Sequence, residues 1–103
     1  MTMNPLLPHQ KYYPLQELIK ERKSDGGDFT LTILFIDEHL KKYGKTGIPN
    51  SAYRYSSIFW SNDLRSPTHV WKPAWLTNGC YVTSIDNVSE EKRTGSIKFS
   101  FKR

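Results

Sequence analysis

The segment CYVTSIDNVSEEKRTGSIKFSFKR, residues 80–103, decides the fold. Near its end, Ile97, Phe99 and Phe101 alternate with serine and lysine. Side chains of a strand point alternately to its two faces, so this period of two predicts a strand with one buried face. CYVTSID is expected to pair with it as the first strand of a hairpin, with the polar residues 87–95 as the turn.

Upstream of the hairpin the sequence predicts helices. Apolar residues recur at helical spacing in residues 12–23 and again in residues 33–44. Thr32 is placed to cap the second helix and Gly44 to end it. The expected buried face of that helix is Ile33, Ile36, Leu40 and Tyr43.

Shorter elements are expected between these helices and the hairpin. Residues 29–32 suit a small strand, and a single helical turn near Asn50 is expected before residues 56–60 extend. A third helix is expected over residues 68–78, with Pro73 either kinking it or delaying its start.

Three helices followed by a C-terminal β-hairpin make an α+β domain, and helices that precede a two-stranded wing outline a winged helix-turn-helix. The chain has 103 residues, which suits one domain, since domains most often have roughly 100–150 residues. Residues 12–103 are expected to form it. Residues 1–11 are expected to be a loose leader, because Pro5 and Pro8 interrupt them.

Composition limits the possible functions. Cys80 is the only cysteine, which excludes an internal disulfide, and with three scattered histidines it leaves no zinc framework. We therefore expect no metal and no cofactor. The sequence shows neither a signal peptide nor an apolar run of the ~18 residues that a membrane span needs. A cytoplasmic protein without a membrane partner is expected.

The charge is basic and unevenly spread. Lys and Arg number 15 against 10 Asp and Glu, a net charge of +5. Residues 1–50 hold seven basic and six acidic residues, whereas residues 51–103 hold eight and four. A basic excess favours a polyanionic partner, because binding to phosphates releases counterions. Nucleic acid, and DNA rather than RNA, is the first expectation.

The stretch WSNDLRSPTHVWKPAW, residues 60–75, contains all three tryptophans. Aromatic faces interleaved with cations suit stacked bases and phosphates. A small domain with few aliphatic residues must also place rings in its core, and periodicity favours the core for Trp60 and Trp75. For Trp71 both interpretations stay open.

A binding site is expected along this stretch and the hairpin. Arg54, Arg65 and Lys72 suit phosphates, and Asn62 suits a base edge. The alternative is that Asn62 and its neighbour only shape a turn. The candidate binding residues are Arg54, Trp60, Asn62, Arg65, His69, Trp71, Lys72, Lys92, Arg93 and Lys98.

The basic residues of the hairpin have two interpretations. In a winged domain, Lys92, Arg93 and Lys98 would reach the phosphate backbone beside the groove. Alternating lysines also protect an exposed strand from pairing with another strand. The two roles are compatible.

Catalysis is not expected. Asp63, Glu90 and Lys92 resemble the acidic and basic residues of a metal-dependent phosphodiesterase, but SEEKRTG is typical of a solvated turn rather than a strand beside a metal. His39 lies beside the buried stripe of its helix without a nucleophile at a telling spacing. No phosphate-binding loop or HExxH motif occurs.

Several short motifs, taken in order, resemble a family of small uncharacterised bacterial and phage domains. The pattern runs YxPL, LTF, LPxSA, WWxN, AWxxAGWxV and VxFxR. The matching segments are Tyr13-Pro14-Leu15, Leu31-Thr32, residues 48–52, residues 59–62, Ala74-Trp75 with Gly79 and Val82, and residues 101–103. The chain departs from the pattern at Phe59, Asn78 and Cys80. The resemblance implies one domain from Tyr12 onward, with Trp60, Asn62 and Trp75 as a structural unit.

Two functions follow, and the first ranks narrowly higher. One is a winged-helix-like module that binds duplex nucleic acid without catalysis. The other is a protein inhibitor or adaptor of phage type. The resemblance implies for it a host defence protein as partner, such as a CRISPR or restriction nuclease. Exposed aromatics and Arg65 would form that interface, because Trp, Tyr and Arg dominate interface hot spots.

Overall fold

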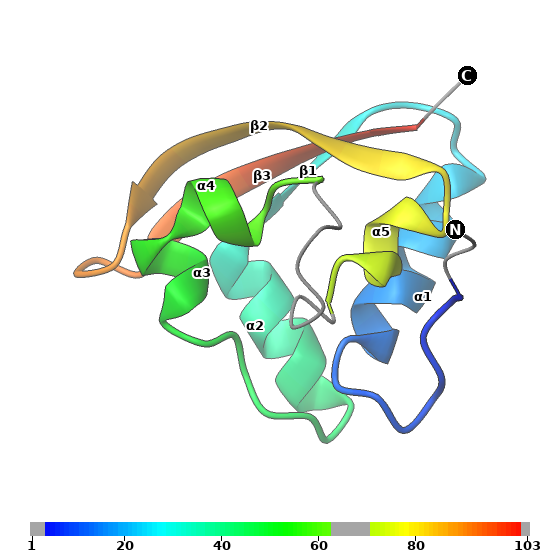
Figure 1. Cartoon of the computed structure of the whole chain (residues 1–103), viewed down its shortest axis with the longest axis horizontal. Helices are drawn as coiled ribbons and strands as arrows, with labels where there is room; N and C mark the ends of the chain where they lie inside the picture. Colours follow the sequence, from blue (N-terminus) through cyan, green and yellow to red (C-terminus); the bar gives the residue numbers. More distant parts are fainter. Residues whose placement is uncertain (1–3, 63–70, 102–103) are drawn as a thin grey trace.

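A three-stranded antiparallel sheet forms one layer of the protein, and the helices pack beneath it (Figure 1). The computed structural model describes residues 4–62 and 71–101. The elements of these ranges are, in chain order, α1 (Tyr13–Lys23), β1 (Phe29–Thr32), α2 (Ile33–Lys42), α3 (Ser51–Arg54), α4 (Ser56–Phe59), α5 (Pro73–Leu76), β2 (Cys80–Ser89) and β3 (Thr94–Phe101). The α+β class is therefore confirmed. The strand order is β1-β3-β2, which makes β3 the central strand.

The predicted hairpin is present, with a longer first strand, a second strand that begins two residues earlier, and a shorter turn. Ile97 and Phe99 are fully buried, which confirms the inward face of β3. The register shifts between Asp86 and Ser89, and Asn87 has a φ of 56°. This irregularity accommodates extra residues inside β2 without ending the ladder. The turn is therefore confined to residues 90–93 instead of 87–95.

The small strand predicted at residues 29–32 is β1. Leu31 pairs with Ile97 and Phe29 with Phe99, so the apolar side chains of both strands share the inner face. The rings of Phe29 and Phe99 stack with their centroids 5.2 Å apart. This pairing fastens the region between the first two helices to the end of the chain.

Helix α2 begins where the sequence predicts. The side chain of Thr32 accepts a hydrogen bond from the backbone N–H of Phe35 at 3.0 Å, which confirms the N-cap. Three of the four residues of the predicted stripe are buried, but Tyr43 is 56% exposed. That part of the prediction is wrong because the helix ends at Lys42, and Gly44, with a φ of 79°, turns the chain away.

The extension predicted for residues 56–60 is wrong. Residues Ser56–Phe59 form α4, and the N–H groups of Ile58 and Phe59 donate to the carbonyl oxygen of Tyr55. Phe59 and Trp60 are both buried. Consecutive side chains of a strand point to opposite faces, so only a helical turn lets both adjacent rings enter one core.

The predicted third helix is shorter than expected. It is α5, with Pro73 at its first turn, which fits the expectation that proline delays the start. Residues 68–70 of the prediction lie outside the described residues. Gly79, with a φ of 69°, follows α5 and leads into β2.

Residues 4–11 contain no helix or strand, yet part of this segment is fixed. Leu6 is buried, and the Gln16 side chain both accepts from its N–H at 2.7 Å and donates to its carbonyl oxygen at 3.2 Å. This pair of hydrogen bonds ties Leu6 to α1.

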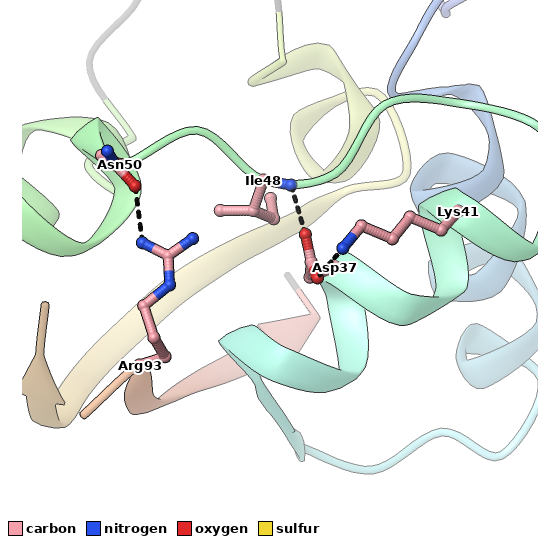
Figure 2. A network of polar contacts seen from close by, with 5 residues as sticks. All are labelled: Asp37, Lys41, Ile48, Asn50 and Arg93. Carbon is pink, nitrogen blue, oxygen red and sulfur yellow. Dashed lines mark hydrogen bonds and ion pairs between the residues drawn. The ribbon is translucent and has the colours of Figure 1, made fainter. Parts of the chain in front are cut away.

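The loop after α2 is held by one carboxylate (Figure 2). Asp37 accepts from the N–H of Ile48 at 2.7 Å and forms an ion pair with Lys41 at 3.0 Å. Gly47 lies directly against this contact, and a Cβ added there would collide with the Asp37 carboxylate. A side chain at this position would therefore force the Asp37 and Lys41 side chains to move.

Gly47→Ala is expected to destabilise the fold by about 1–3 kcal/mol, because overpacking forces neighbouring groups to shift. Gly27→Ala is the matched control, since a Cβ at Gly27 meets nothing within 4 Å. Urea unfolding of the two variants measures the difference. Equal midpoints would show that the Asp37 contact does not restrict the loop.

Candidate functional site

Two of the three tryptophans belong to the core. Trp60 and Trp75 have no exposed surface, as their periodicity favours, and their ring centroids lie 5.8 Å apart. The Trp60 indole donates its Nε1 hydrogen bond to the carbonyl oxygen of Ala52 at 3.1 Å. Trp60 therefore cannot stack on a ligand in this conformation, although it was a candidate for that role.

Asn62 holds the sheet to the helices. Its Nδ2 donates to the carbonyl oxygen of Val82, and its Oδ1 accepts from the N–H of the same residue, both at 2.9 Å. Oδ1 also accepts from the Trp75 indole at 3.1 Å. The carboxamide thus pairs with β2 as a neighbouring strand would. These contacts give Asn62 a structural role across twenty residues, which differs from the local turn that the alternative assigned to it.

Lys72 is another candidate that the fold encloses. Its side chain has no exposed surface, and Nζ donates to the hydroxyl of Ser61 at 2.9 Å. A buried ammonium costs several kcal/mol of desolvation unless polar partners surround it. Lys72 is therefore an internal anchor near the end of α4 and not a surface contact for phosphate.

The hairpin tip is fastened to α3. Arg54 forms an ion pair with Glu90 at 3.1 Å, and this hydrogen-bonded carboxylate raises the pKa of the guanidinium. Arg93 donates to Asn50 at 2.6 Å (Figure 2), and its guanidinium carbon lies 4.4 Å from the centroid of the Tyr53 ring. Arg54 and Arg93, the two arginines of the expected binding set that the structure describes, are thus engaged within the chain.

Lys92 and Lys98, the remaining candidate binding residues of the hairpin, are exposed. Lys92 lies in the turn and Lys98 on the outer face of β3, opposite Thr30 and Ser84. Between residues 80 and 101 the basic Lys92, Arg93 and Lys98 face an equal number of acidic residues, Asp86, Glu90 and Glu91. Lys102 and Arg103, which lie outside the described residues, bring the net charge of residues 80–103 to +2.

An open groove of about 250 Å³ lies where α3 and α4 meet Trp71. We call it the α4 groove, and its lining residues are Ser51, Tyr55, Ile58, Phe59 and Trp71. Tyr55 is 56% and Ile58 57% exposed. Trp71 is half-buried and stacks on Phe59 with ring centroids 4.1 Å apart. Its indole donates to the carbonyl oxygen of Phe59 at 2.7 Å, which fixes the ring at the wall of the groove.

Sequence reasoning selected Trp71 but missed Ile58 and Ser51 as its companions. The expectation of an extended segment at 56–60 hid the helical spacing that places Tyr55 and Ile58 on one side. Arg65, His69 and Asp63 lie outside the described residues. Of the eight candidate binding residues that the structure describes, Trp71 alone lines the groove.

The described residues contain no cluster of metal ligands. Within residues 4–62 and 71–101, no group of three or more His, Cys, Asp or Glu side chains is placed to hold a metal. Glu90, considered for a nuclease site, is the ion-pair partner of Arg54. In the same ranges no helix is long and apolar enough to cross a membrane.

Comparisons with models of protein families, with curated proteins and with solved structures give no match. The resemblance to small bacterial and phage domains stays a prediction. Function is therefore inferred from the geometry of the chain itself.

Asn62→Asp is expected to cost about 1–3 kcal/mol, because an oxygen then faces the Val82 carbonyl where an amide donated. Asn4→Asp introduces the same charge at an exposed position and serves as the control. Urea unfolding at pH 7 compares the two. A midpoint for Asn62→Asp equal to that of the control would contradict the bridging role.

Cys80 is 1% exposed, and burial raises the pKa of its thiol to about 12. We expect iodoacetamide to label the native protein slowly at pH 8, and the labelling rate to rise with urea in parallel with unfolding. Because this pKa lies above the unfolded value of about 8.5, the thiol's contribution to stability is lost as pH rises between them. Rapid labelling of the folded protein would contradict the buried thiol.

Proposed function

We propose that this chain is a non-catalytic binding module that holds a protein partner in the α4 groove. The observation that carries the proposal is the exposure of Tyr55 and Ile58 beside a ring that is already fixed, Trp71. Apolar side chains with more than half of their surface in water gain free energy when a partner covers them. Trp and Tyr are also enriched among the residues that dominate protein interfaces.

Rigidity supports this proposal. Phe59 and Trp60 anchor α4 in the core, and the Arg54–Glu90 ion pair joins α3 to the hairpin. A pre-formed surface loses little conformational entropy on binding, so more of its contact energy contributes to affinity. An adaptor or an inhibitor would use such a surface. A host defence nuclease is one partner class that the sequence resemblance implies.

Nucleic-acid binding is the second candidate, and two observations favour it. The chain carries a net charge of +5, and the helices precede a two-stranded hairpin as in a winged helix. Against it, Arg54 and Arg93 are engaged within the chain, and α3, α4 and α5 have four residues each. In a helix-turn-helix the second helix lies in the major groove, and α5, the helix that directly precedes the hairpin, is a single turn of four residues.

Affinity capture from a lysate of the source cells tests the first candidate with three baits. Ile58→Asp places a charge in the α4 groove and is expected to weaken capture of the partner at least tenfold, as loss of a hot spot does. Leu7→Asp is the control, because Leu7 is equally exposed, at 55%, but does not line the groove. Mass spectrometry quantifies the proteins retained by each bait.

The candidates differ in their response to nuclease and salt. A protein retained by wild type and Leu7→Asp, lost with Ile58→Asp, and unaffected by nuclease treatment supports the protein-binding module. Equal retention by all three baits contradicts it. A gel shift of DNA at low salt that disappears steeply as salt rises would instead support the second candidate.

A further inference from the structure

A second pocket, of about 270 Å³, lies between α1 and the end of α2, and none of its lining residues belongs to the α4 groove. Its walls differ in chemistry from those of the groove, because they combine aromatic rings with carboxylates. The residues that matter here are Tyr13, Pro14, Glu17, Glu21, His39 and Tyr43.

The two carboxylates give the pocket a negative side on a basic protein. Glu17 and Glu21 are four residues apart on α1, so their side chains lie on the same side of the helix. In the part of the chain that the structure describes, neither carboxylate forms an ion pair. Lys45, which also lines the pocket, donates instead to the carbonyl oxygen of Pro8 at 3.1 Å.

The aromatic side of the pocket is held in place. The Nε2 atom of His39 lies 3.2 Å from the carbonyl oxygen of Pro14, and the His39 ring meets the Tyr43 ring edge-on at 5.0 Å. Tyr43 is 56% exposed, and the ammonium of Lys42 already lies 5.7 Å from its centroid. This ring therefore accepts a cation over its face.

We propose that this pocket binds an arginine side chain presented by a protein partner. A guanidinium is planar, stacks on tyrosine and forms forked hydrogen bonds with carboxylates, so it matches both sides of the pocket. An arginine inside a peptide brings no free carboxylate, whereas free arginine would carry one toward Glu17 and Glu21. The proposal does not depend on the α4 groove.

The test is a titration of the isotope-labelled full chain, followed by NMR, with Nα-acetyl-arginine amide as the probe. The citrulline analogue has nearly the same shape without the charge. We expect the arginine probe to shift signals of Tyr13, Glu17 and Tyr43 with millimolar affinity. The citrulline probe should bind at least tenfold more weakly, and free arginine more weakly than the blocked probe.

Variants locate the site. The double variant Glu17→Gln/Glu21→Gln is expected to weaken the arginine probe at least tenfold, and Tyr43→Ala several-fold. The matched control, Asp28→Asn/Glu91→Gln, removes two exposed carboxylates outside the pocket and should leave affinity unchanged.

Three results would overturn the proposal: equal shifts with the citrulline probe, unchanged binding by both pocket variants, or an equal loss in the control. Stronger binding of free arginine than of the blocked probe would assign the pocket to a small molecule instead. Ile58→Asp must leave arginine binding unchanged, so failure here and failure of the α4 groove are distinguishable.

Discussion

Two indole rings without exposed surface hold the short helices against the sheet. Helices α3, α4 and α5 have four residues each, and an isolated helix of that length is not stable in water. Trp60 joins α4 to α3 through the carbonyl oxygen of Ala52, while Trp75 packs edge-on against Phe99 of the central strand at 5.9 Å. The shape of this half of the molecule therefore depends on ring burial and not on helical propensity.

Burial of these rings also determines which side chains of the segment remain exposed and able to bind a partner. The same stretch that contains Trp60 and Trp75 contains Lys72, whose ammonium is enclosed, and Trp71, whose ring is half exposed. Trp71 reaches the surface because Phe59 lies under it. The aromatic segment is thus mostly structural. Its contribution to the surface is the stacked pair of Phe59 and Trp71, which lines the α4 groove.

The sequence predicted those helices and strands whose signal lies within a few neighbouring residues. The alternation before Phe101, the cap at Thr32 and the helical stripe of α2 depend on neighbours in sequence, and each is present. The role of Asn62 was not predictable in that way. Its partner Val82 is twenty residues away, and only the assembled sheet brings the two together.

The candidate site was predicted only in part, because the contacts of its residues also depend on partners that are distant in the sequence. The sequence indicates that arginines and aromatic rings are close along the chain, but not which of them pair with each other. Arg93 meets Asn50 across 43 residues, and Arg54 meets Glu90 across 36. In such pairs, residues that were expected to bind a partner instead connect two distant parts of the chain. The helical turn at Ser56–Phe59 depends on a core that no short window of sequence describes.

The order of the strands has a consequence for the synthesis of the protein. The central strand, β3, is the last of the three to leave the ribosome. More than sixty residues of chain separate it from β1, with which it pairs. Until then neither ladder exists, and Leu31 and Phe29 have no partner strand. Such distant closure slows folding, so the apolar side chains of β1 stay without their sheet partner until β3 has been synthesised.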